Sequence, residues 1–65
     1  MFRYYLTQRS PSLGTQPRGT TNVVDYGKKI LTEEIGWEVW GYVEYKKPLT
    51  PTQISNYELI EEVIH

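Results

Sequence analysis

The chain has 65 residues, a formal net charge of −1 at pH 7 and no cysteine. This length predicts a single domain over residues 1–65 with a small core, because a chain of this size buries only about 60% of its unfolded surface. The lack of cysteine excludes disulfide bonds and thiolate zinc sites. We therefore expect two Trp, six Tyr and one Phe to supply most of the buried apolar area.

No apolar run approaches the ~20 residues of a membrane span, and the N-terminal residues lack the apolar segment of a signal peptide. We expect no membrane association. The lack of cysteine also favours a cytoplasmic location.

Charge is unevenly distributed along the chain. Residues 1–29 carry five basic residues against Asp25, whereas residues 30–65 carry two lysines against seven glutamates. A basic arm is one way to meet nucleic acid. Because a sheet of this size brings its halves side by side, we favour interleaving of opposite charges within the fold. Arg9 and Arg18 are then expected to meet either an anionic group or the acidic half of the chain.

The N-terminal half predicts two strands separated by a long loop. Residues 2–8, FRYYLTQ, show the period of two that is typical of a strand, and the even-numbered positions are expected to face the core. Two prolines and two glycines make residues 10–21 a loop. The β-branched residues of 21–26, TNVVDY, predict a second strand. The GKK of residues 27–29 predicts a turn after it.

Residues 30–36 leave two interpretations open. Thr32 with the following glutamates and Gly36 suits a single helical turn, and the same residues suit an irregular, extended approach to the next strand. Residues 37–46 then predict a third strand. This strand ends before Pro48, because proline cannot donate to a sheet ladder.

LTPTQI contains the clearest local pattern in the chain. Thr50 suits the N-cap, Pro51 suits the first helical position, and Gln53 completes a capping box. We predict a short helix over residues 51–57. Residues 58–64 fit either a continuation of this helix or a final strand, and we favour the strand.

These elements predict an α+β fold: a small three- to four-stranded, mostly antiparallel sheet with one short helix on one face. In the third strand, WEVWGYVEY, the odd positions of 37–45 form the better core face, because the even positions alternate aromatic and charged residues. One helix covers one side of the sheet, which leaves Trp40 and Tyr42, beside Tyr5, on the more open face. Gly41 removes a side chain where a neighbouring ring or backbone approaches closely.

Two explanations of this open aromatic face compete. In the first, its rings are cross-strand partners that stabilise the sheet by about 0.2–1 kcal/mol per pair, with the proline-glycine loop folded over them. In the second, the face docks a partner, since Trp, Tyr and Arg dominate interface hot spots. A homodimer through this face satisfies both. The candidate binding residues are Tyr5, Arg9, Trp40 and Tyr42.

The sequence gives little support for catalysis. The only histidine is His65, which excludes a plausible Ser-His-Asp or Cys-His site and a zinc site built on histidines. The two adjacent Glu pairs diverge on a helix or a strand and are interpreted as solvated charges. GTQPRGTT has the glycine spacing of a phosphate-binding loop, but Thr20 stands where lysine is required. We expect no enzymatic activity, no cofactor and no metal.

A non-enzymatic protein-binding module is therefore the expected function, and the partner is another protein or a second copy of the chain. The alternative is a domain that binds single-stranded nucleic acid by stacking bases on the same aromatic face. Glu38 and Glu44 flank that face and would repel phosphates. A protein partner fits it better.

Several motifs occur in a familiar order: RYYLTQRSP, PRGTTNVVDY, EIG, WGYVEYKKPLTPTQ and NYEL. With them, residues 3–59 resemble a group of short bacterial and phage-like proteins labelled as related to DarA, a phage protein that defends injected DNA against restriction. The resemblance implies a small protein of mobile-element or gut-bacterial origin in an antirestriction setting. It implies no catalytic residues.

Overall fold

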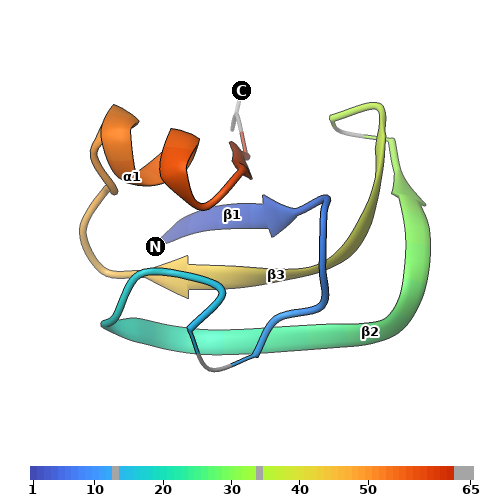
Figure 1. Cartoon of the computed structure of the whole chain (residues 1–65), viewed down its shortest axis with the longest axis horizontal. Helices are drawn as coiled ribbons and strands as arrows, with labels where there is room; N and C mark the ends of the chain where they lie inside the picture. The colour runs from blue at the N-terminus through green and yellow to red at the C-terminus, as the bar shows by residue number, and fades with distance from the viewer. Residues whose placement is uncertain (13, 34, 63–65) are drawn as a thin grey trace.

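The computed structural model describes residues 1–12, 14–33 and 35–62. These residues form an antiparallel sheet in the order β2-β3-β1-β4 and one short helix beside it (Figure 1). The predicted α+β class is confirmed. In chain order the elements are β1 (Phe2–Leu6), β2 (Thr20–Thr32), β3 (Trp37–Tyr45), α1 (Pro51–Asn56) and β4 (Leu59–Glu61).

Strand β1 lies inside the sheet, between β3 and β4. Tyr5 stands opposite Tyr42 of β3 on one side and Ile60 of β4 on the other. Three consecutive residues, Tyr4, Tyr5 and Leu6, are buried, so both faces of the sheet are covered at β1. The predicted core positions 4 and 6 are confirmed, whereas position 2, also expected in the core, is exposed.

The core lies on the face of the sheet that α1 covers. Tyr4 and Tyr45 meet edge to face with ring centroids 5.8 Å apart, and the Tyr4 hydroxyl accepts a hydrogen bond from the Leu49 amide at 2.8 Å. Leu49 and Ile54, on either side of the helix cap, pack against this cluster. The odd positions of β3 are buried as predicted from Val39 onward.

The turn predicted at residues 27–29 is wrong, because β2 continues through them to Thr32. The pairing of β2 with β3 slips between Asp25 and Ile30, so residues 26–29 stand opposite Trp40 alone. Gly27, with φ of +73°, allows this irregularity, and its amide donates to Asp25 Oδ1 at 2.8 Å. GKK therefore forms a bulge in an edge strand.

The chain reverses instead between Thr32 and Trp37, which are paired across the hairpin. The Gly36 amide donates to the Thr32 carbonyl at 2.8 Å, and Gly36 has φ of +71°. Beyond the bulge, β2 and β3 curve together past the C-terminal end of β1 (Figure 1). The sequence left two interpretations of residues 30–36. In the structure, residues 30–32 are the end of β2, and the hairpin turn follows them.

The predicted start of the helix is confirmed in detail. The Gln53 amide donates to Thr50 Oγ1 at 3.1 Å, and the Thr50 amide donates to Gln53 Oε1 at 3.0 Å. Helix α1 ends at Asn56, one residue before the predicted end, and the favoured final strand is confirmed as β4. Residues 63–65, which include part of the predicted strand and His65, lie outside the described residues.

The long loop before β2 packs onto the sheet. Pro11 and Pro17 are both buried, and the Tyr45 hydroxyl donates to the Pro17 carbonyl. A Cβ added at Gly41 would lie 3.0 Å from Pro11 Cγ. Within the part of the chain that the structure describes, no helix has the length and apolar character needed to span a membrane.

Candidate functional site

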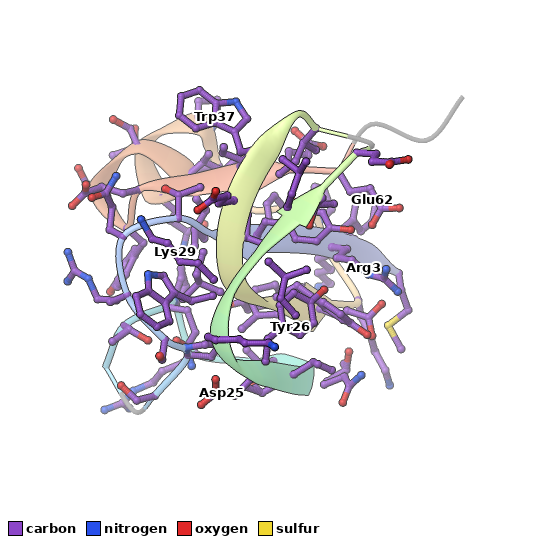
Figure 2. All side chains as sticks on the ribbon, turned by 90° about the vertical axis from the view of Figure 1, so that its right-hand side faces the viewer. Arg3, Asp25, Tyr26, Lys29, Trp37 and Glu62 are labelled. Atoms are coloured by element: carbon purple, nitrogen blue, oxygen red, sulfur yellow. The ribbon has the colours of Figure 1, made fainter. Side chains whose placement is uncertain are left out.

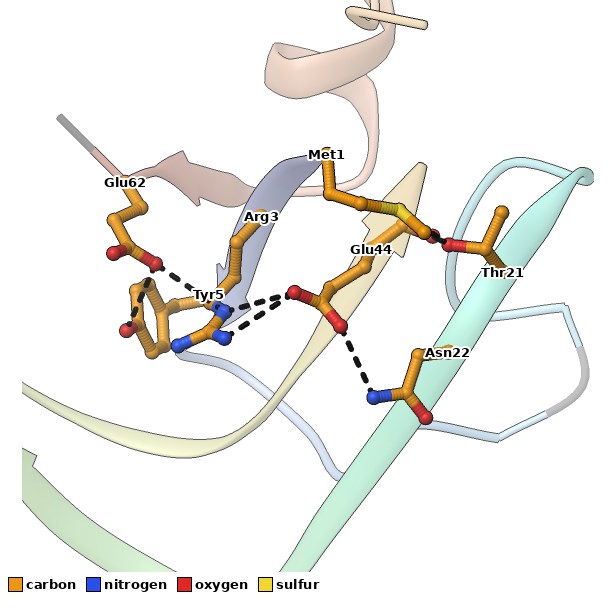
Figure 3. A network of polar contacts seen from close by, with 7 residues as sticks. All are labelled: Met1, Arg3, Tyr5, Thr21, Asn22, Glu44 and Glu62. Carbon is orange, nitrogen blue, oxygen red and sulfur yellow. Dashed lines mark hydrogen bonds and ion pairs between the residues drawn. The ribbon is translucent and has the colours of Figure 1, made fainter. Parts of the chain in front are cut away.

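The face of the sheet opposite the core carries a charged network centred on Arg3 (Figure 3). Arg3 Nη2 lies 3.2 Å from Glu44 Oε2, and Arg3 Nε lies 3.3 Å from Glu62 Oε2. Glu62 also accepts from the Tyr5 hydroxyl at 3.3 Å, and Glu44 Oε1 accepts from the Asn22 side-chain amide at 3.0 Å. The network joins three strands to the residue that follows β4.

Arg3 is the cation at the centre of this network, and it lies between the carboxylates of Glu44 and Glu62. Burial disfavours the Arg3 cation, but hydrogen bonds with Tyr5 and Glu44 and the charge of Glu62 hold the pKa of Arg3 well above its usual value. The hydrogen bond from Asn22, followed by the contact with Arg3, lowers the pKa of Glu44. Two carboxylates therefore satisfy Arg3, which was not among the candidate residues.

Aromatic rings continue the same face. The Tyr5 and Tyr42 ring centroids are 5.9 Å apart, and those of Tyr26 and Tyr42 are 6.1 Å apart. The Arg3 guanidinium lies 4.1 Å from the Tyr42 centroid. The predicted neighbourhood of Tyr5 and Tyr42 is confirmed, but the expectation that Tyr5 lies near water is wrong, because this residue is only 1% exposed. Its neighbours in the network and the adjacent strands cover it.

The two remaining candidate residues lie elsewhere. Trp40 is partly buried opposite the β2 bulge, where Lys29 Nζ lies 6.0 Å from its ring centroid. Its indole Nε1 is buried, with no hydrogen-bond partner among the described residues. Arg9 is exposed and pairs with Glu58 at 3.2 Å, just beyond α1. The predicted interleaving of the basic and acidic halves is therefore confirmed for Arg9, and Arg3 shows the same behaviour.

A different group of apolar residues is exposed at the far end of the β2–β3 hairpin. We name Ile30, Leu31 and Trp37 the hairpin end; they are 40%, 59% and 59% exposed. Ile30 and Trp37 share one face of the hairpin, since their partners are Val39 and Thr32, and Leu31 lies on the other face. Figure 2 shows Trp37 at the margin of the molecule, directed away from it.

Sequence reasoning missed the hairpin end because it assigned Trp37 to the core face of β3 and left residues 30–36 without a definite structure. The available signal was local. Apolar residues on both sides of a glycine-containing turn, as in ILTEEIGW, lie at the far end of a hairpin if the turn closes there. Among the described residues, no group of three or more His, Cys, Asp or Glu side chains is placed to hold a metal ion.

The family model described as "Defence against restriction A C-terminal" matches residues 1–62, so the chain belongs to this family. The match includes every strand and the helix. It confirms the resemblance suggested by the sequence motifs. No curated protein and no solved structure matches the chain.

Proposed function

We propose that this member of the "Defence against restriction A C-terminal" family is a non-enzymatic protein-binding module that acts in defence against restriction. Its docking surface is the hairpin end. The observation that carries the proposal is the exposure of large apolar side chains on both faces at the far end of the β2–β3 hairpin, where Trp37 and Leu31 are each 59% exposed. A mobile-element setting and a cytoplasmic location belong to the same proposal.

The exposure of large apolar residues supports this choice. The far end of the hairpin leaves Ile30 and Trp37 exposed on one face and Leu31 exposed on the other. Exposed apolar surface such as that of Ile30 and Trp37 marks interaction sites in soluble proteins, and tryptophan is among the residues enriched at interface hot spots. Glu38, opposite Leu31, and the lysines of the bulge supply the polar rim that surrounds such a surface.

The backbone edge of β2 is a poorer docking surface than the side chains of the hairpin end. An unpaired edge invites a partner strand, but the bulge at residues 26–29 interrupts the edge, and Lys28 and Lys29 place charge on it. Both features oppose the regular addition of a strand. Contact through the side chains of the hairpin end needs no continuous edge.

The aromatic face of β1 and β3 supports a structural role better than a binding role. Tyr5 is buried, and Arg3 is committed to Glu44 and Glu62. Few groups are left there for stacking on bases or for contact with phosphates. We propose that this network fixes the positions of β1, β3 and β4, while the partner binds at the hairpin end.

Site-specific photo-cross-linking tests this proposal. A benzophenone amino acid at position 37, in the protein expressed in its native cell, should give a discrete adduct with another protein. The same group at Thr52, which is exposed on α1, is the matched control. Position 37 has room for the probe because Trp37 is already exposed. An adduct of twice the chain's mass would identify a second copy as the partner, and equal labelling from positions 37 and 52 would contradict docking at the hairpin end.

A further inference from the structure

A cleft lies where three segments distant in the sequence meet. The larger of two adjoining cavities, about 510 Å³, is lined by the loop before β2 and by Tyr57, which follows α1. The second, about 260 Å³, continues to Lys46 and Lys47, which follow β3. Both cavities share Arg18 and Gly19, so together they form one extended, open cleft.

The strand register explains why these segments converge. Thr20 pairs with Tyr45, so the residues before Thr20 run beside the residues after Tyr45. Arg18 is brought to Lys46 and Lys47 in this way. The Tyr45 hydroxyl, donating to the Pro17 carbonyl, holds the loop in place from within the core. The basic side chains therefore stand on anchored backbone.

The charge of this cleft is not neutralised within the described residues. Arg18, Lys46 and Lys47 are exposed, and none of them makes an ion pair in that part of the chain. Arg3 and Arg9, by contrast, are paired with glutamates. Although the protein is slightly acidic overall, it thus presents three free cations at one place, which is the footprint of a polyanion site.

The two acidic residues that adjoin the cleft in the sequence are both paired. Glu44 precedes Tyr45 but is paired with Arg3 at 3.2 Å. Glu58 follows Tyr57 but is paired with Arg9 at 3.2 Å. Two of the last four carbonyls of α1 accept hydrogen bonds, since the Tyr57 amide donates to Gln53 O and the Glu58 amide donates to Ser55 O, each at 3.1 Å. Neither the carboxylates nor the helix end opposes an anion in the cleft strongly.

Tyr57 adds an apolar platform to the basic cleft. Tyr57 is 39% exposed and lines the larger cavity. An exposed ring beside a row of cations is the combination that proteins use for single strands, in which bases stack on aromatic rings and phosphates follow the positive groove. A closed pocket for a small anion would need more enclosure than this open cleft provides.

We propose that the cleft formed by Arg18, Lys46, Lys47 and Tyr57 binds single-stranded nucleic acid, with phosphates on the three cations and a base on the ring. This site differs from the hairpin end. In Figure 1 the segments that form the cleft lie towards the left side of the molecule, and the hairpin end lies at its right side. Nucleic acid and a protein partner can therefore be held at the same time without overlap.

Fluorescence anisotropy with a labelled single-stranded DNA of about twelve nucleotides tests the site. Lys46→Ser/Lys47→Ser should weaken binding by about tenfold or more at low salt, and should reduce the slope of log affinity against log salt by about 1.4, because two phosphate contacts are lost. Tyr57→Leu should weaken binding by at least about fivefold while leaving that slope unchanged.

The matched control is Lys28→Ser/Lys29→Ser, which removes a second adjacent lysine pair from the bulge of β2. It should bind as the wild type does. An equal loss of DNA affinity in the two double-lysine variants would overturn the assignment. So would competition by polyphosphate, which has charge but no bases, that is as strong as competition by unlabelled single-stranded DNA. Trp37→Ser should also bind the DNA normally, so failure at the cleft and failure at the hairpin end are distinguishable.

Discussion

At the scale of single residues, Gly41 shows how close contact determines a sequence choice. A Cβ at this position would lie 2.1 Å from the backbone oxygen of Val24, far inside any real contact distance. The obstacle is a carbonyl of the neighbouring strand, which cannot rotate away as a side chain would. The sequence-based expectation of a close approach at Gly41 is confirmed.

Gly41→Ala should therefore be among the most damaging small substitutions in this chain. We expect a loss of roughly 3 kcal/mol in the free energy of unfolding, since relieving the overlap requires β2 and β3 to separate. Gly36→Ala is the control, because a Cβ there meets open space and only its φ of +71° costs stability, about 1–2 kcal/mol. Urea denaturation measures both, and equal midpoints for the two variants would contradict the steric explanation.

Tyr5 shows where reasoning at this scale stops. Its neighbour in the opposite strand, Tyr42, follows from alternation within β3 and is found where expected. Its burial does not follow, because that depends on Glu62, far away in the sequence, reaching back to the Tyr5 hydroxyl. Exposure on one face of a sheet is decided by residues that local patterns do not connect.

At the scale of elements, local patterns are reliable when the interactions that define an element are themselves local. The cap of α1 joins residues three positions apart, so the sequence predicts both of its hydrogen bonds. The GKK of β2 is the opposite case. A glycine with positive φ serves a turn and a bulge equally well, and only the pairing of Ile30 with Val39 distinguishes them.

Thr50→Ala should destabilise the protein by about 1 kcal/mol, because it leaves the Gln53 amide without its cap. Thermal or urea unfolding monitored by circular dichroism measures the loss. Thr52 is the exposed second residue of α1. Thr52→Ala makes the same chemical change without altering the cap, and its stability should stay within about 0.5 kcal/mol of the wild type. If the two variants unfold alike, α1 does not depend on this cap.

At the scale of the whole molecule, β1 lies between β3 and β4, so the first and last strands of the described chain are neighbours in one sheet. This order explains why the basic and acidic halves interleave: Arg3 contacts Glu44 and Glu62, and Arg9 contacts Glu58. The same order places Arg18 beside the Lys46–Lys47 pair, and none of these three makes an ion pair among the described residues. The charge counts predict that the basic and acidic halves of the chain form ion pairs, but only the order of the strands determines which residues form them.

The same topology buries Tyr45, the residue that joins the core to the basic cleft, and this leads to a prediction about pH. Burial, together with the nearby Tyr57 and Tyr4, raises the pKa of Tyr45 to about 12 from an ordinary value of about 10. Between those values the unfolded chain has lost the phenolic proton while the folded chain keeps it. Folding stability is therefore complete below about pH 10 and decreases as the pH rises toward 12.

A shift of this size corresponds to a loss of roughly 2–3 kcal/mol across that range. Tyr45→Phe cannot titrate, so its stability should be lower at neutral pH by about 1 kcal/mol, through the missing hydrogen bond to Pro17, yet fall less steeply in alkali. Urea midpoints from about pH 8 to pH 11.5 for both proteins measure the difference, in which contributions common to the two proteins cancel. Parallel curves would show that Tyr45 does not carry the alkaline sensitivity.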